Sequence, residues 1–315
     1  MSDCEDDPAE GAVLKQVTQG VKTGSDMRQT AQRQAGTGAL GVLLTLIPLV
    51  GSAAAGNLWE TLPEPPPLPQ AVKSGFAPVG DIRMFYAVFG EGAPVLLLHG
   101  GLANSDYWSE VIPILIRHHL KVIVADSRGH GRSTRSAQPY SYELMASDVI
   151  GLLDYLKIGK TDLAGWSDGG IIGLDIAMHH PERLRRLFAY GANSDPSGVK
   201  DVEKSPNFSA FITRARGEYA RLSPTPGDYD AFLKQIEAMW AQQPNWTRPQ
   251  LQQIKVPTAI ADGAYDEAIK REHTEYLARA IPGAKLVILP DVSHFGMLQN
   301  PQEFTTAVLS FLDAH

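Results

Sequence analysis

From residue 76 onward, short continuous apolar runs alternate with amphipathic stretches. Runs such as Pro94–Leu98 and Val122–Ala125 end at turn residues, which is typical of strands buried on both faces of a parallel sheet. Further strands are expected at Ile82–Phe89, Thr161–Gly165, Leu184–Tyr190, Pro257–Ala261 and Lys285–Leu289.

Apolar residues at helical spacing fill the segments between these runs. The pattern is clearest over Tyr142–Leu156, where six large apolar side chains share one face. Other helices are expected near Tyr107–Arg117, Asp168–His179, Ile269–Ala280 and Pro301–Leu312. Alternating strands and helices predict an α/β fold, in which a mostly parallel sheet carries helices on both faces.

Residues 196–250 interrupt this alternation. They contain amphipathic stretches around Phe208–Arg221 and Asp228–Trp240, and no run of the buried-strand kind. We therefore expect a small helical cap, inserted into a domain that spans residues 76–315.

The first 75 residues have a different character. A basic start near Met27, an apolar run over 39–50 and small residues ending at Ala55 are the three parts of a secretory signal peptide. The pattern predicts a signal peptide at 27–55 and a periplasmic or secreted protein, with an uncleaved membrane anchor as the alternative. Residues 1–26 are acidic and fit such a signal badly, so we expect a start at Met27 and a non-native extension before it. Residues 56–75 are rich in proline and predict a stiff linker.

Composition narrows the choice of function. The 315-residue chain is 43% hydrophobic with a net charge of −7, so it can bury a large core and has no broad basic field for nucleic acid. The single cysteine, Cys4, excludes an intrachain disulfide framework. Gly36–Gly41 matches the glycine pattern of a dinucleotide-binding loop but follows no predicted strand. His118–His119 and His179–His180 are pairs of neighbours in sequence, and neighbours do not share a helix face on which to bind a metal. We expect neither cofactor nor metal.

Gly165-Trp166-Ser167-Asp168-Gly169 carries the strongest chemical signal. It follows a predicted strand and opens a predicted helix, which is the setting of a G-x-S-x-G nucleophile elbow. Small residues must flank so tight a turn, and the turn exposes the Ser167 hydroxyl at a helix N-terminus. Ser167 is therefore the candidate nucleophile.

Backbone donors for an oxyanion are expected beside it. The turn His99-Gly100-Gly101 follows the Pro94–Leu98 strand, so the N–H of Gly101 can meet the N–H of Asp168, the residue after the nucleophile. His99 is expected to orient this loop rather than to transfer protons.

An acid and a base follow later strands. Asp266 lies just beyond the Pro257–Ala261 strand, and His294 beyond the next one. Strands of a parallel sheet end at one edge, so these residues can converge on Ser167. Asp262 competes for the acid role but is expected to lie on the strand itself, and we favour Asp266.

With these motifs the chain resembles the α/β-hydrolase superfamily over residues 75–315. The resemblance rests on five segments together: His99–Gly101, Asp126–Ser133, Gly165–Gly169, Gly263–Asp266 and Ser293–Phe295. It implies a serine hydrolase that uses Ser167, Asp266 and His294 on a small ester, through an acyl-enzyme.

Within the superfamily, Gly165–Ile171 and Tyr190–Asn193 look like the biphenyl hydrolase-like branch, the valacyclovir hydrolases. There the Asp after the nucleophile binds a substrate α-amino group, so the resemblance implies an amine contact at Asp168. The secretion signal expected at residues 27–55 of this chain is a departure from the pattern of that branch.

Alternatives with the same triad stay open: lactonase, perhydrolase, aminopeptidase and C–C bond hydrolase. A non-catalytic small-molecule-binding protein on the same fold is the alternative of another class. Trp166, Trp108 and Phe295 flank the proposed site and are expected to line the substrate pocket. The expected partner is a small-molecule ester, with no stable membrane insertion after signal cleavage; the sequence leaves the oligomeric state open.

Overall fold

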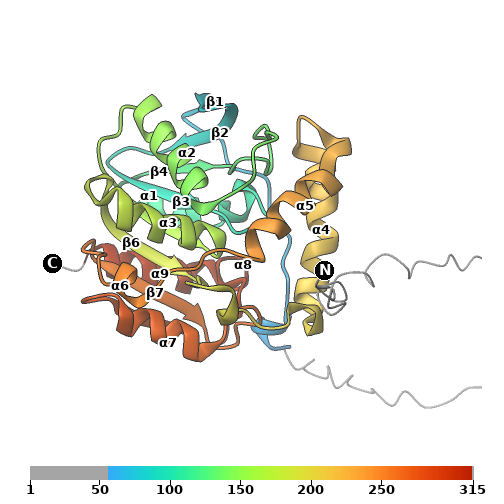
Figure 1. The fold of residues 1–315 in the computed structure, drawn as a ribbon. Coiled ribbons are helices and arrows are strands. Elements are labelled where there is room, and N and C mark those ends of the chain that lie inside the picture. Colours follow the sequence, from blue (N-terminus) through green and yellow to red (C-terminus); the bar gives the residue numbers. More distant parts are fainter. Residues whose placement is uncertain (1–55, 314–315) are drawn as a thin grey trace, which may run out of the picture. The chain divides into compact units, whose positions relative to one another are not determined.

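An eight-stranded sheet runs through residues 56–313, the part of the chain that the computed structural model describes (Figure 1). Its strands are β1 (Lys73–Val79), β2 (Ile82–Phe89), β3 (Ala93–Leu98), β4 (Leu120–Ala125), β5 (Thr161–Trp166), β6 (Leu184–Tyr190), β7 (Thr258–Gly263) and β8 (Lys285–Leu289). They lie in the order β1-β2-β4-β3-β5-β6-β7-β8. β2 is antiparallel to both neighbours, and the other pairs are parallel.

The central strands end together. Leu98 on β3 pairs with Gly165 on β5, and Gly165 pairs with Ala189 on β6. The loops that follow these strands therefore leave the sheet side by side, at the edge where parallel sheets place their ligands.

Helices cover both faces of the sheet. The helices of the described residues, including those of the cap, are α1 (Val111–Arg117), α2 (Tyr142–Tyr155), α3 (Asp168–His179), α4 (Pro206–Leu222), α5 (Tyr229–Trp240), α6 (Arg248–Leu251), α7 (Arg271–Ala280), α8 (Gly296–Gln299) and α9 (Pro301–Leu312). On β6, Leu187 lies close to Gly173 of α3, whereas Phe188 packs against Phe304 of α9. Successive strand residues point to opposite faces, so α3 and α9 lie on opposite sides of the sheet.

These elements confirm the predicted α/β fold class. The boundaries of β2, β6, β8, α3 and α9 coincide with the ranges expected from the sequence. The helix expected from Tyr107 instead begins at Val111, after a short 3-10 turn. Pro113 explains the later start, because proline lacks an N–H and is tolerated only in the first helical turn.

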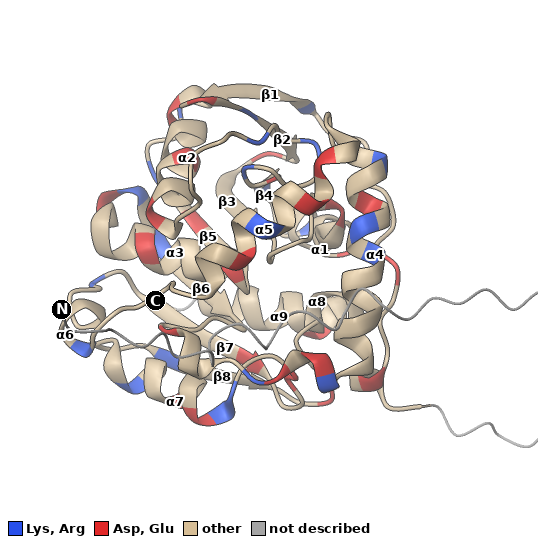
Figure 2. Ribbon diagram, turned by 45° about the vertical axis from the view of Figure 1, so that its right-hand side comes forward, with Lys and Arg blue, Asp and Glu red and all other residues tan. Residues whose placement is uncertain are grey.

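The segment between β6 and β7 carries the cap. Helices α4 and α5, drawn in gold and orange, lie beside the sheet rather than on one of its faces (Figure 1). Phe211, Ala215, Phe232 and Ile236 are buried on the inner sides of these two helices. Acidic and basic residues are interspersed along the helices rather than gathered by sign (Figure 2).

Residues 56–72 differ from the expected linker. Trp59 stacks on Tyr265 with ring centroids 3.8 Å apart, and Leu62 and Leu68 pack against the core. The Asn207 side chain donates to the Trp59 carbonyl, and Arg214 donates to the Leu62 and Pro63 carbonyls. We call residues 57–63 the strap. Proline-rich backbone has unpaired carbonyls, and side chains of α4 use them here as acceptors.

The strand β1 was not expected from the sequence, and its first three residues fall within the expected linker. Its sequence Lys73–Val79 contains Gly75 and Pro78 and has only two buried residues. Proline is tolerated on an edge strand, where one side of the backbone needs no partner. The proposed signal peptide and the acidic extension lie outside the described residues.

Candidate active site

Ser167 occupies a strained turn between β5 and α3. Its φ of 53° and ψ of −120° are unusual for a residue with a side chain, and such strain is concentrated at functional sites. A Cβ on Gly165 would lie 2.2 Å from the Gly169 carbonyl oxygen, and one on Gly169 would lie 2.2 Å from that of Leu98. Only glycine fits at both positions, so the sequence G-x-S-x-G is what allows the turn to form.

Asp266 and His294 form a buried pair. The Nδ1 atom of His294 lies 2.6 Å from Oδ2 of Asp266. The other oxygen of Asp266 accepts the backbone N–H groups of Ala268 and Ile269, each at 2.6 Å. The carboxylate is thereby fixed in orientation, and it holds the Nδ1–H tautomer of His294, which leaves Nε2 free to accept a proton.

The charges of this pair support each other. Burial opposes ionisation of Asp266, but the charge and hydrogen bond of His294 outweigh it and hold the pKa of that carboxyl below its usual value. Burial likewise lowers the pKa of His294, yet Asp266 outweighs this and the net pKa is raised. An imidazolium at His294 would therefore be stabilised by Asp266.

Asp262, the competing acid, takes a different role. It lies on β7, where Oδ1 accepts the Gly263 N–H and Oδ2 accepts the Thr274 hydroxyl. Burial and the neighbouring Asp266 charge raise its pKa well above the usual value. Among the described residues it is Asp266 that hydrogen-bonds to His294, so the geometry favours Asp266 over Asp262.

A residue that the sequence did not single out holds the His294 loop. Glu267 accepts the backbone N–H of His294 at 2.9 Å and the Ser293 hydroxyl at 3.1 Å. The side chain of Gln299 also binds Ser293: it accepts the Ser293 backbone N–H and donates to the Ser293 hydroxyl oxygen. In the sequence, Glu267 is marked out only by its position directly after Asp266. Its contacts with Ser293 and His294 arise from the packing of two loops, which the sequence pattern does not indicate.

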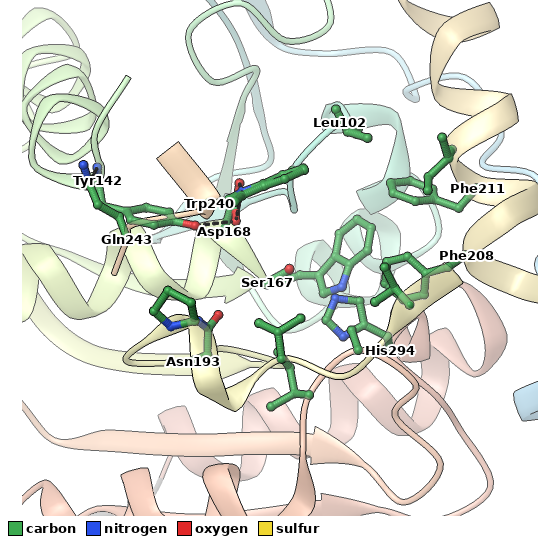
Figure 3. A pocket seen from close by; sticks show the side chains of 18 residues that line it. Leu102, Tyr142, Ser167, Asp168, Asn193, Phe208, Phe211, Trp240, Gln243 and His294 are labelled. Atoms are coloured by element: carbon green, nitrogen blue, oxygen red, sulfur yellow. Dashed lines mark hydrogen bonds between the residues drawn. The ribbon is translucent and has the colours of Figure 1, made fainter. Parts of the chain in front are cut away.

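Ser167 and His294 both line a cavity of about 240 Å³ (Figure 3). No direct hydrogen bond joins these two described side chains, and in a site without substrate such bonds often remain long. Apolar side chains form most of the wall: Leu102, Trp166, Pro196, Val199, Val202, Phe208, Phe211, Ile212, Trp240, Ala268 and Ile269. Among the described residues, no Lys or Arg lines it.

The predicted oxyanion donors lie at this cavity. Asp168 is the first residue of α3, so its N–H has no partner within the helix. Gly101 lines the cavity beside it, and a Cβ there would lie 2.7 Å from an Asp168 side-chain oxygen. His99 orients this loop: its Nε2 accepts the Ser127 N–H at 2.9 Å, and its Nδ1 donates to the Gly100 carbonyl at 2.7 Å.

The Asp168 side chain is buried at the cavity wall. Its Oδ1 accepts the Tyr142 hydroxyl at 2.7 Å, and both oxygens accept the Trp240 indole N–H, at 3.1 and 3.0 Å. Burial raises the pKa of Asp168 to about 6, opposed by these neutral donors and by the charge of His294. At neutral pH the site therefore holds a second carboxylate, besides Asp266.

Two of the expected pocket residues lie elsewhere. Trp166 lines the cavity, but Trp108 is fully buried and packs against Phe304 of α9. Phe295 is also fully buried, behind the site, where it contacts Trp166 and His294. Trp108 is covered by Phe304 of α9, and Phe295 by Phe208 and Phe211 of α4. Cap residues such as Phe208 and Trp240 form the cavity wall instead.

Within residues 56–313 no helix combines the length and hydropathy of a membrane span. In the same range, no group of three or more His, Cys, Asp or Glu side chains is arranged to hold a metal ion.

Comparison with known proteins gives consistent matches. A family described as the alpha/beta hydrolase fold matches residues 93–227. The RutD protein of Pseudomonas savastanoi pv. phaseolicola is 30% identical over 70% of this chain and 95% of its own length. The mouse serine hydrolase BPHL is 27% identical over 77% of this chain and 87% of its own.

A solved structure supports the same relationship. A hydrolase from Pseudomonas aeruginosa PA01 superimposes with a TM-score of 0.61 and 28% sequence identity. It covers 78% of this chain and 100% of that one.

Proposed function

The chain belongs to the α/β-hydrolase family and is a hydrolase, and from that premise we propose that it is a serine hydrolase of small carboxylic esters. One observation carries the proposal. The Asp266–His294 pair, 2.6 Å apart, opens onto the same cavity as a serine held in a nucleophile elbow. This is the combination that nucleophilic acyl transfer requires.

The reaction proceeds in two halves. Ser167 Oγ attacks the ester carbonyl carbon while His294 Nε2 takes its proton, and the oxyanion lies on the N–H groups of Gly101 and Asp168. The carbon–oxygen bond to the leaving alcohol then breaks, and His294 returns the proton to that alcohol. In the second half, His294 takes a proton from water as the water oxygen attacks the acyl carbon. The bond from that carbon to Ser167 Oγ then breaks, His294 gives the proton to Oγ, and the acid is released.

The cavity wall supports an uncharged acyl group. Its surface is largely apolar, and none of the described Lys or Arg side chains lines it. A substrate carboxylate would therefore be buried without a cation, at a cost of several kcal/mol, on the order given for unpaired buried charges. This favours neutral esters over the carboxylated substrates of the lactonase and C–C hydrolase alternatives.

The experiment uses p-nitrophenyl acetate and a fluorophosphonate probe. We expect the wild-type chain to release nitrophenol and to be labelled at Ser167, located by peptide mass spectrometry. Ser167→Ala should abolish both, and Asp266→Asn should lower kcat by about 10⁴-fold because it favours the wrong imidazole tautomer. A wild-type chain that neither turns over nor is labelled is the result expected of a non-catalytic binding protein.

A preference for amino-esters is the second candidate, favoured by the environment of Asp168. Its carboxylate accepts from a phenol and an indole, and both donors are neutral. A substrate ammonium group would supply the missing positive charge, and a charge-assisted hydrogen bond is worth roughly 1.5–3 kcal/mol.

The amine preference can be tested with a valine ester and its des-amino analogue. We expect the wild type to favour the valine ester by about tenfold or more in kcat/KM. This preference should grow as the pH rises from 5 to 7, because Asp168 ionises with a pKa of about 6. Asp168→Asn keeps one side-chain acceptor oxygen for Trp240 and should lose both the preference and its pH dependence. Equal rates on the two esters in wild type and variant would contradict an amine site.

A further inference from the structure

The cap is hydrogen-bonded to the nucleophile elbow at one buried point. Trp240, the last residue of α5, donates its indole N–H to both oxygens of Asp168, at 3.1 and 3.0 Å. Tyr142 of α2 donates to the same carboxylate at 2.7 Å. Since Asp168 begins α3, the indole is held in place from the rigid end of a core helix.

The indole ring covers Gly101. A Cβ added to Gly101 would lie 2.3 Å from Cζ2 and 3.1 Å from Cη2 of Trp240. The ring therefore fills the space into which any other residue at position 101 would project. It touches both residues whose N–H groups face the oxyanion in the proposed mechanism, Gly101 by contact and Asp168 by hydrogen bond.

The opposite wall is built differently. In Figure 3, Ser167 lies between the Trp240–Asp168 side and the side formed by Phe208 and Phe211 of α4. The two phenylalanine rings are held by packing against each other and against Phe295. A side chain held only by packing can adjust its rotamer to a substrate, whereas the indole of Trp240 would have to break its hydrogen bonds to a buried carboxylate.

We propose that Trp240 is a specificity-determining residue, which limits the width of the acyl group at the carbon next to the scissile carbonyl. This inference rests on the proposed ester hydrolysis. A carbonyl oxygen bound by Gly101 and Asp168 places that carbon beside the indole. An alkyl branch there meets a fixed ring, while the main acyl chain can extend along the apolar wall on the α4 side. An α-ammonium group in the place of that branch would instead donate to the Asp168 carboxylate.

The test compares p-nitrophenyl butyrate with its branched isomer, p-nitrophenyl 2-methylpropanoate. The two acyl groups have the same atoms, so the ratio of their kcat/KM values reports shape rather than hydrophobicity. Trp240→Ala and Trp240→Leu should each raise the branched-to-straight ratio by about tenfold, the scale of one methylene in a pocket. Trp240→Phe keeps a ring but loses the hydrogen bonds to Asp168 that fix it, so it should raise the ratio by an intermediate amount, about threefold.

The matched control is Trp246→Ala. Trp246 is also a half-buried tryptophan of the cap, but it does not line the cavity. Its removal should leave the ratio unchanged. If both Trp240→Ala and Trp240→Leu lower the two rates equally, Trp240 only stabilises the cap and the proposal is overturned. If the wild type hydrolyses neither ester and Ser167 is not labelled, the proposed function itself fails and this inference fails with it.

Discussion

At the scale of single residues, the partners of each buried carboxyl group decide what that group does. Asp262 lies on β7 and Asp266 lies in the loop that follows, and both are buried. Of the two, Asp266 is paired with an imidazole, which lowers its pKa. Asp262 has only neutral donors and its pKa is raised. The chemistry of each group therefore follows from its nearest partner and not from its depth alone.

Glu218 of α4 is a buried carboxyl that the proposed mechanism does not use. It accepts the Asn104 amide at 2.8 Å and the Tyr107 hydroxyl at 3.4 Å. Burial raises its pKa to about 7, opposed by Arg214 and Arg221. The Glu218 carboxyl therefore holds its proton more tightly in the folded state than in the unfolded chain. Its contribution to the free energy of unfolding is present at low pH and is lost as the pH rises from about 4.5 through 7.

Glu218→Gln should therefore stabilise the protein above pH 7. At about 1.4 kcal/mol per pKa unit, the gain is on the order of 2–3 kcal/mol at pH 8 and close to zero at pH 4.5. Urea unfolding at the two pH values measures it. The exposed Glu110→Gln serves as the control, and an equal effect of Glu218→Gln at both pH values would contradict the linkage argument.

At the scale of elements, the strap joins parts that are distant in sequence. Residues 57–63 contact α4 through Asn207 and Arg214, the loop of Asp266 through Tyr265, and α8 through Gln299, which donates to the Thr61 carbonyl. The cap helix and both loops of the Asp266–His294 pair are thereby tied to one short segment.

Trp59→Ala should destabilise the protein by about 1–2 kcal/mol, because it removes the ring stacked on Tyr265 together with its buried area. Arg214→Ala should cost a similar amount through its two carbonyl contacts. If the strap acts as one unit, the double variant should cost less than the sum of the two, as measured by thermal unfolding. As a control, Val72→Ala at an exposed position should stay within about 0.5 kcal/mol of the wild-type stability. If the effects of Trp59→Ala and Arg214→Ala simply add in the double variant, the two contacts are independent and the strap does not act as one unit.

At the scale of the whole molecule, we propose that the protein is exported. The proposal rests on the signal pattern at residues 27–55, whose apolar run ends in an A-x-A sequence at Ala53–Ala55. Expression of the full chain in a bacterium with periplasmic fractionation should give a mature protein that begins at Gly56. A chain that keeps its N-terminus and sediments with the membrane would support an uncleaved anchor instead. The predicted cleavage leaves every residue of the strap in the mature chain.

Sequence alone determined the fold class and the family. Strands buried on both faces of a parallel sheet need continuous apolar runs, so β3 and β5 are recognisable in the sequence. The turn at Ser167 is recognisable too, because it needs glycine where a side chain would meet the backbone. The later matches to hydrolases confirm the family resemblance drawn from those motifs.

Only the tertiary structure decided how the pocket is built. Trp108 and Phe295 follow the loops of Gly101 and His294 in sequence, but α9 covers Trp108 and α4 covers Phe295. Trp240 comes from the cap, 73 positions after Ser167. The strap, the contacts of Glu267 and the neutral donors around Asp168 likewise depend on contacts between distant segments. Local pattern records which face of an element is apolar; it does not record which other element will cover that face, because that depends on the packing of the whole chain.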